Sequence, residues 1–332
     1  MARVALFLLL LSTFFLATVA SEGREFYVAS WNLENLFDLE DDPAVEGDEE
    51  YLPGAPKRWT QERLNIKLGN QAKVISKMNG GRGPDVLGLC EVENRKVVEL
   101  LMAKLSPLGR KYEIVHQDSP SDRGIDCAII YDANVFELVD SGFHFIDAQK
   151  TRDIVEAKLR HDGRDVYVFM NHWPSRGNDE WQRCLAAVVL RKRLDEVLAA
   201  DPKADIVLLG DFNDESDNVA LTKFLLVAPT PENLPAGTLF DTTASIQAAG
   251  KGTSVFDNAW ELIDHIIVSP GLLDDEGFRW KPNSSERIEF PELFFHPRFP
   301  GAIPRPSKSY SDESFHNDGY SDHLAVGCII KL

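Results

Sequence analysis

The chain has 332 residues, of which 44% are hydrophobic and 27% are charged; these fractions fit a soluble globular protein and exclude a disordered or collagen-like chain. Aspartate and glutamate number 53 against 35 lysines and arginines, and the net charge of −18 argues against salt-driven adhesion to nucleic acid or to an anionic membrane. A small positive or metal-bearing cleft is still compatible with such an acidic protein.

The first twenty residues have the pattern of a cleaved secretory signal. Arg3 supplies a positive start, Val4 to Ala20 carry no charge and are rich in leucine and phenylalanine, and small residues precede Ser21. A buried helix or an uncleaved anchor is the alternative, but 17 uncharged residues are marginal for a membrane span. We therefore expect a signal peptide over residues 1–20, no stable membrane anchor, and a secreted or periplasmic protein.

Strand-like and helix-like patterns alternate after this segment. Phe26 to Leu33 is predicted to be a strand, and the acidic run 38–50 is predicted to be a solvated loop, with weak calcium binding as the alternative. Apolar residues at three- and four-residue steps predict a helix over 60–78. The near-continuous apolar run 84–92 predicts a strand covered on both faces, and a second helix is expected over 95–105.

The remaining elements include a hairpin and one long connection. A strand over 127–131 precedes strands over 154–159 and 166–170, and Asp162-Gly163 between the last two marks a hairpin turn. Next come a helix over 179–199 and strands over 206–210, 262–269 and 324–330. Residues 270–321 are predicted to form a long irregular excursion. No linker divides the chain, and the mixture predicts sheets in the middle with helices outside.

The four cysteines are too few for a disulfide scaffold. Cys90, Cys127 and Cys328 lie in strand-like runs and Cys184 lies in a helix-like run. Buried free thiols are predicted. In an oxidising compartment, one disulfide between two strand cysteines is the alternative.

Polar residues gather at the ends of the apolar strands, where a carboxylate or imidazole is expensive to bury without a partner. The residues concerned are Asn32, Glu91, His172, Asp211, Asn213, Asp264, His265, Asp322 and His323. A single residue of this kind can be a structural group whose hydrogen bonds are satisfied within the protein. A repeated occurrence at six strand ends is better explained by a single convergent site.

The chemical types in this set point to metal-assisted hydrolysis of a phosphoester. Carboxylates with an asparagine are hard oxygen donors that suit Mg²⁺, Mn²⁺ or Ca²⁺, and two histidines could stabilise phosphate charge. The sequence has no H-E-x-x-H, G-x-G-x-x-G, P-loop or G-x-S-x-G pattern, which counts against a zinc protease, a nucleotide-cofactor enzyme and an α/β-hydrolase.

Seven motifs together resemble the endonuclease/exonuclease/phosphatase superfamily, and in particular its secreted bacterial members that begin W-N-L-E-N-L-F. They occur in the family's order along nearly the whole mature chain: SWNLENLF (30–37), GLCEVEN (88–94), RGIDCAIIYD (123–132), NHWPS (171–175), GDFND (210–214), IDHIIVS (263–269) and SDH (321–323). The resemblance implies an α+β fold, a four-layer α/β/β/α sandwich of two packed mixed β-sheets flanked by helices, over residues 24–332.

The resemblance also implies a role for each motif residue. Asn32, Glu91 and Asp322 match the metal positions. Catalytic positions are matched by His172 (leaving oxygen), Asp211 (attacking water), Asn213 (phosphate), Asp264 (partner of the final histidine) and His323 (phosphate). The expected cofactor is Mg²⁺, with Mn²⁺ or Ca²⁺ as alternatives.

Neighbouring residues have less specific signals. Glu34 and Glu93 each lie two residues beyond an expected ligand, so on a regular strand they would share its face, although capping is an equal alternative. Substrate contacts are expected from Arg123, Asp126 and Arg176, while Arg183 could contact phosphate or simply cover its helix. His265, Trp31 and Trp173 are predicted to be structural.

These features predict a metal-dependent phosphoric ester hydrolase, in first place an endonuclease-like nuclease acting on nucleic acid as a monomer. A sphingomyelinase or an inositol- or sugar-phosphate phosphatase would use the same core, and a non-catalytic binding module is a remote alternative. GDFND also fits calcineurin-like metallophosphatases, but their other motifs are not found at suitable places.

Overall fold

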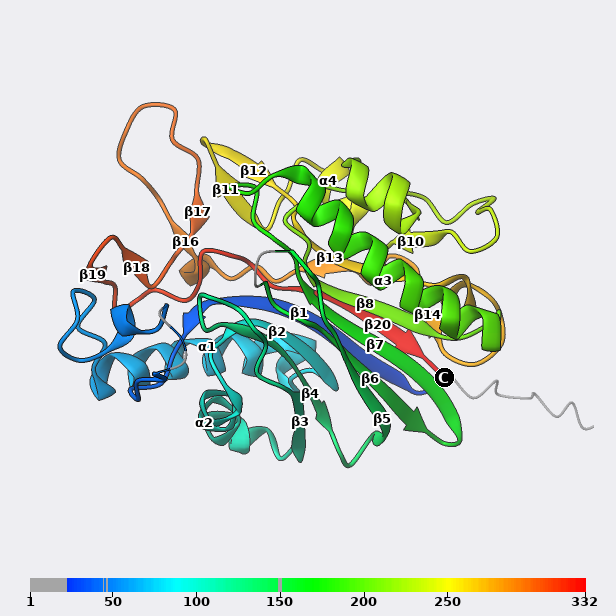
Figure 1. Cartoon of the computed structure of the whole chain (residues 1–332), viewed down its shortest axis with the longest axis horizontal. Helices are drawn as coiled ribbons and strands as arrows, with labels where there is room; N and C mark the ends of the chain where they lie inside the picture. Colours follow the sequence, from blue (N-terminus) through cyan, green and yellow to red (C-terminus); the bar gives the residue numbers. More distant parts are fainter. Residues whose placement is uncertain (1–22, 44, 46, 149–150) are drawn as a thin grey trace, which may run out of the picture.

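Two mixed β-sheets lie face to face in the middle of the computed structural model, which describes residues 23–332 apart from 44, 46 and 149–150 (Figure 1). The expected signal peptide over 1–20 lies outside the described residues. Within the described part, no helix is both long and apolar enough to cross a membrane.

The first sheet has the strand order β14-β20-β1-β2-β4-β3, and β15 also pairs with β20. Strands β1 and β2 are parallel and the other pairs are antiparallel. Its strands are β1 (Glu25–Leu36), β2 (Val86–Val92), β3 (Tyr112–His116), β4 (Asp126–Asp132), β14 (Arg279–Trp280), β15 (Glu286–Arg287) and β20 (Val326–Lys331).

The second sheet has the order β5-β6-β7-β8-β13-β10-β9, with β7–β8 and β9–β10 parallel. Its strands are β5 (Glu137–His144), β6 (Ile154–His161), β7 (Arg164–His172), β8 (Ile206–Asp211), β9 (Val227–Ala228), β10 (Leu239–Asp241) and β13 (Asp264–Val268). A central core containing Val28, Cys90, Met170 and Leu209 joins the two sheets.

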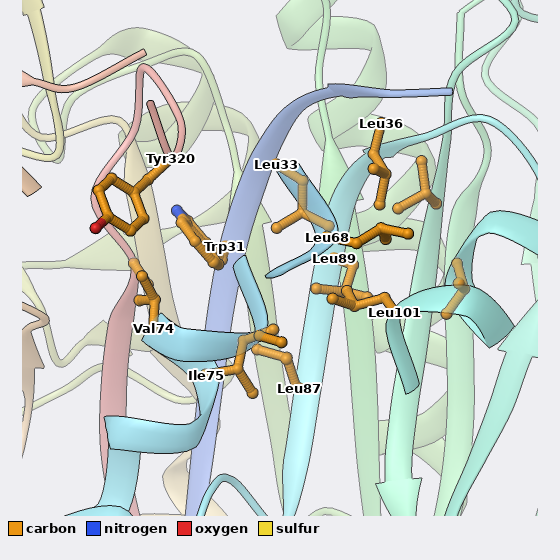
Figure 2. Packing of buried hydrophobic residues seen from close by; sticks show 14 of the residues in the cluster. Trp31, Leu33, Leu36, Leu68, Val74, Ile75, Leu87, Leu89, Leu101 and Tyr320 are labelled. Carbon is orange, nitrogen blue, oxygen red and sulfur yellow. The ribbon is translucent and has the colours of Figure 1, made fainter. Parts of the chain in front are cut away.

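Helices cover both outer faces and complete a four-layer sandwich, as predicted. Helices α1 (Gln61–Gly81) and α2 (Arg95–Leu105) pack on the first sheet, whereas α3 (Glu180–Ala200) and the π-helical segment η3 (Ala220–Leu225) pack on the second. Figure 2 shows Leu68 and Ile75 of α1 beside Leu33, Leu87 and Leu89 of the first sheet. The apolar spacing that predicted the helix therefore corresponds to its buried face.

The elements predicted from the sequence are confirmed, with shifted ends. The predicted helices correspond to α1, α2 and α3, and the predicted strands correspond to β1, β2, β4, β6, β7, β8, β13 and β20. Thr60 caps α1, because its Oγ1 accepts a hydrogen bond from the backbone N–H of Arg63. Outside the 270–321 excursion, strands β3, β5, β9, β10, β11 and β12 were not predicted.

The excursion over 270–321 is irregular, as predicted, and is built from very short elements. They are η4 (Pro270–Leu273), β14, β15, η5 (Pro291–Leu293), β16 (Phe294–Phe295), β17 (Arg305–Pro306), β18 (Tyr310–Ser311) and β19 (Ser314–Phe315). The other short elements are η1 (Glu49–Tyr51), η2 (Ser106–Leu108), α4 (Ala244–Ala248), β11 (Ser254–Phe256) and β12 (Ala259–Glu261).

All four cysteines are free thiols, and the three strand cysteines are buried, as predicted. The alternative of a disulfide is therefore not realised in this structure. Cys90 and Cys127 do face each other in the β2–β4 pair.

Candidate active site

Side chains from the ends of several strands meet around Asp211, the last residue of β8. Asp211 lies opposite His172 in the parallel β7–β8 pair and opposite Asp264 in the antiparallel β8–β13 pair. The preceding Gly210 has a φ of +139°, and a Cβ there would lie 2.0 Å from the backbone oxygen of Asn171. Only glycine therefore lets β8 approach β7 closely at this point.

The carboxylate of Asp211 is buried and contacted from both sheets. Its Oδ2 accepts a hydrogen bond from Asn32 Nδ2 (3.1 Å) and lies 3.7 Å from His172 Nε2 and 3.8 Å from His323 Nε2. Its Oδ1 accepts a hydrogen bond from the backbone N–H of Asn213 (2.9 Å). Burial raises the pKa of Asp211 to about 6 against the opposing charge of His323.

His323 is held in a hydrogen-bonded pair. Its Nδ1 lies 2.8 Å from Asp264 Oδ2, as the sequence predicted, and its Nε2 faces Asp211. Burial alone would lower the pKa of His323, but Asp264 and Asp211 raise it well above the usual value. The imidazole therefore carries a positive charge at neutral pH, stabilised mainly by Asp264.

Glu91 occupies a distorted end of β2. The pairing register of β2 shifts between Cys90 and Val92, and Glu91 itself has a φ of +60°. Its Oε2 accepts a hydrogen bond from the backbone N–H of Asn35 (2.8 Å), and its Oε1 lies 3.8 Å from His172 Nε2 and 3.4 Å from Arg123 Nη2. Bulges of this kind redirect side chains beside functional sites.

His172 is uncharged in this environment. Burial, followed by the charges of Arg152 and Arg123, lowers its pKa well below the usual value. Its Nδ1 is buried without a hydrogen-bond partner, whereas its Nε2 faces both Glu91 and Asp211. The two histidines thus differ: His323 is a cation and His172 is a neutral imidazole.

Arg152 is a site residue that the sequence analysis missed. It is buried, its Nη2 donates a hydrogen bond to the backbone oxygen of Trp173 (3.0 Å), and its charge acts on Glu91, His172 and Asp211. Arg152 precedes β6, which is antiparallel to β7, so the start of β6 lies beside the end of β7. Searching strand starts as well as strand ends would have found it.

Glu34 and Glu93 both act as local caps. Glu93 Oε2 accepts a hydrogen bond from the backbone N–H of Asp38 (2.5 Å), and Glu34 accepts hydrogen bonds from the backbone N–H groups of Ser309 and Tyr310. Lys67 of α1, fully buried, donates to the backbone oxygen of Glu34 (2.6 Å) and lies 3.6 Å from its carboxylate. The sequence gives no signal for the role of Lys67, because this residue occupies an apolar helix face outside any motif.

Asp322 is exposed to solvent, yet its carboxylate interacts electrostatically with His323, Glu34, Glu91 and Lys67, so it lies near the expected ligand Glu91. Two other expected site residues, Arg176 and Asp126, lie at the margin of this arrangement. Arg176 forms a two-pronged ion pair with Glu261, and Asp126 bonds to Ser119 instead of facing Asp211.

The residues predicted to be structural have structural partners. Trp31 and Trp173 are buried in hydrophobic cores. His265 is hydrogen-bonded to Asp241 and to the backbone oxygen of Asp214. Arg183, for which phosphate contact and coverage of its helix were alternatives, is buried and binds the side chain of Asp214.

Metal-type ligands are concentrated at the centre of the site. Asp211, Asp264 and His323 each offer one ligand atom within 4.8 Å of the others, and Asp264 Oδ1 is buried without a hydrogen-bond partner. The surrounding donors, including Glu91 and the amide of Asn32, are oxygen-rich. Because His323 is charged and bonded to Asp264, the oxygens of Glu91 and Asn32 beside this cluster are the donors that can hold a hard divalent cation.

The sequence pattern of the endonuclease/exonuclease/phosphatase family matches residues 27–331. Among curated proteins, Protein angel of Drosophila melanogaster is 27% identical over 207 residues, which cover 57% of this chain and 55% of that protein. The chain thus spans about half the length of this curated relative.

Solved structures share the fold over most of the chain. A mannosyl-6-phosphatase from Bacteroides thetaiotaomicron superposes with a TM-score of 0.59 at 19% identity, covering 92% of this chain and 100% of that chain. TDP2 from D. rerio, complexed with a single-strand DNA product, superposes with a TM-score of 0.56 at 15% identity, covering 93% and 99%.

Proposed function

The chain belongs to the endonuclease/exonuclease/phosphatase family of metal-dependent phosphoric ester hydrolases, and on this premise we propose that it is an endonuclease-like nuclease that hydrolyses phosphodiester bonds of nucleic acid. The observation that carries the chemistry is the placement of a charged His323 and a buried Asp211 side by side, 3.8 Å apart. The charged His323 can stabilise negative charge on the phosphate, and Asp211 can take a proton from a water molecule.

In this mechanism Asp211 accepts the proton of the attacking water. A pKa of about 6 leaves it mostly ionised at neutral pH, yet basic enough to take a proton. His323 Nε2 donates to a phosphate oxygen while Asp264 stabilises the ring's charge. Neutral His172 supplies a hydrogen bond to the leaving oxygen, and Asn213 holds the phosphate.

Asn32, Glu91 and Asp322 are the residues proposed to hold Mg²⁺, with Mn²⁺ or Ca²⁺ as substitutes. Their oxygen donors fit a hard cation. Arg123, Arg152 and His323 keep the pKa of Glu91 below its usual value although burial opposes them, so this ligand is ionised. When bound, the cation neutralises charge on the phosphate.

A second candidate is a phosphatase acting on a small phosphorylated sugar or inositol. A cavity of about 160 Å³ is lined by Ser121, Arg123, Thr151 and Arg152 among others. Thr151 Oγ1 and Arg152 Nε are both buried without a hydrogen-bond partner. Donors of this kind would suit a compact phosphate or polyol.

A substrate panel separates these functions. Plasmid DNA, RNA, sphingomyelin, inositol phosphates and mannose 6-phosphate are each incubated with Mg²⁺, Ca²⁺ or EDTA. Nicking of plasmid DNA that requires the metal and is lost in Asp211→Asn supports the nuclease. Release of inorganic phosphate from the monoesters, with plasmid DNA left intact, would contradict the nuclease proposal and support the phosphatase function.

Secretion belongs to the same proposal. The apolar, uncharged run after Arg3 and the small residues before Ser21 support export through a signal peptide. A nuclease exported in this way would act on nucleic acid outside the cytoplasm.

A further inference from the structure

A second cluster of metal-type ligands lies at one end of the β3–β4 pair and shares no residue with the Asp211 cluster. One nitrogen of His116 and one carboxylate oxygen each of Asp118 and Asp126 lie within 4.8 Å of one another. We propose that His116, Asp118 and Asp126 form a second cation site, selective for Zn²⁺ or a similar transition metal. No part of this proposal depends on the substrate of the enzyme.

The strand register explains how the chain brings two of these ligands together. His116 ends β3 and pairs with Ala128 of β4. Asp126 lies two residues before Ala128 on the same strand, so it shares that face of the sheet and is a diagonal neighbour of His116. His116 Nε2 accordingly lies 3.8 Å from Asp126 Oδ2.

His116 has an unsatisfied nitrogen aimed at this cluster. Its side chain is only 2% exposed, and Nε2 has no hydrogen-bond partner. A polar atom buried in this way costs free energy unless something binds it. A cation between Nε2 and Asp126 would satisfy both groups.

Only one of the two carboxylate oxygens of Asp126 is used to hold the β3–β4 loop. Its Oδ1 accepts hydrogen bonds from the backbone N–H and the hydroxyl of Ser119. Its Oδ2 is the atom that faces His116. The geometry therefore leaves one oxygen for the loop and one for a ligand.

Asp118 provides both a third ligand and a path from solvent. Its side chain is 81% exposed, and one of its carboxylate oxygens lies within 4.8 Å of a ring nitrogen of His116 and of a carboxylate oxygen of Asp126. The ring nitrogen nearest to Asp118 is Nδ1, 3.9 Å from its Oδ1. The nearby cation Arg95 of α2 has partners of its own, since it donates to the backbone oxygen of Ile114 (3.1 Å) and lies 3.9 Å from Glu99.

The ligand types indicate which metal the site would bind, and the position of the β3–β4 loop indicates what the bound metal would do. One imidazole and two carboxylates suit Zn²⁺, whereas Mg²⁺ prefers oxygen ligands and water. The loop between His116 and Asp126 also carries Arg123, which donates to Asn35 Oδ1 (2.7 Å) and lies 3.4 Å from Glu91. A cation bound here would fasten the loop that brings Arg123 to the active site.

Equilibrium dialysis with radioactive Zn²⁺ in excess Mg²⁺ tests the site. Because His323 could also bind Zn²⁺, all variants are measured in the wild-type and the His323→Ala backgrounds. Loss of an outer-sphere partner already weakens metal binding about 10–100-fold, so Asp118→Asn and His116→Gln should each weaken one Zn²⁺ site by at least roughly 100-fold. Asp162→Asn is the matched control, because it removes an exposed carboxylate beside a different histidine, His161, and it should leave every Zn²⁺ affinity unchanged.

Asp118→Asn is the decisive variant because Asp118 is exposed and its replacement leaves the packing intact. A Zn²⁺-soaked crystal should show an anomalous peak about 2 Å from a His116 nitrogen. Equal Zn²⁺ binding by the wild type and Asp118→Asn, or a loss of Zn²⁺ caused only by His323→Ala, would overturn the proposal.

Discussion

The ring of His323 and the carboxylate of Asp264 are hydrogen-bonded at 2.8 Å although they lie 59 residues apart in the chain. The neighbouring Asp322 is exposed while His323 is buried, and both residues lie in a bend that precedes β20. Asp264, the first residue of β13, is the partner whose charge raises the pKa of the ring most.

This pair should act as a unit in catalysis. Loss of one preorganised donor typically costs about 10²–10³ in rate, so His323→Ala should lower kcat by roughly that factor. Asp264→Asn should keep the packing but weaken the ring's charge, and the double mutant should lose less than the product of the two single losses. The measurement is kcat for the two single mutants and the double mutant. If the losses simply multiply, the two residues act independently.

Metal dependence should be sensitive to Glu91 and insensitive to Glu93. EDTA should abolish hydrolysis, and Mg²⁺ or Mn²⁺ should restore it. Glu91→Gln should raise the half-saturating metal concentration by at least on the order of tenfold while the protein stays folded. Glu93→Gln is the matched control, because Glu93 bonds to the backbone of Asp38. Full activity in EDTA, or equal effects of both variants, would contradict these roles.

Glu93 should make the protein lose stability as the pH rises from 4.5 to about 8. Burial raises its pKa from 4.5 to about 8, so between these values the folded state holds a proton that the unfolded state has released. Stability therefore falls as pH rises through this window. Thermal unfolding of Glu93→Gln and the wild type at pH 5 and pH 8 should show a smaller decrease in Tm for the variant. Identical decreases would show that Glu93 is ionised in the folded protein.

The N-terminus of the exported protein should lie near Ser21. The charged start and the apolar run to Ala20 predict cleavage after Ala20. N-terminal sequencing of protein recovered outside the cytoplasm checks this, with Arg3→Glu as a variant expected to slow export. A soluble cytoplasmic product that retains Met1 would be incompatible with secretion.

Local patterns were sufficient to predict most elements and the central residues of the candidate site. Helix α1 follows from apolar spacing, because one face of the helix packs on a sheet, and α2 and α3 were predicted close to their observed positions. Asp211 and His172 were found because polar residues at the ends of buried strands are unusual. The Asp264–His323 bond was also expected, because the resemblance to the family implied that Asp264 is the partner of the final histidine.

Only the tertiary structure could place Arg152, Lys67 and Glu93. The sequence does not show that β6 runs antiparallel to β7 and thereby brings Arg152 to the site, or that α1 buries Lys67 against Glu34. Regular alternation predicted that Glu93 would share the face of Glu91, but the bulge with a φ of +60° at Glu91 breaks it. Sequence periodicity describes which face of a single element is buried, whereas strand pairing, bulges and contacts between layers depend on segments far apart in the chain.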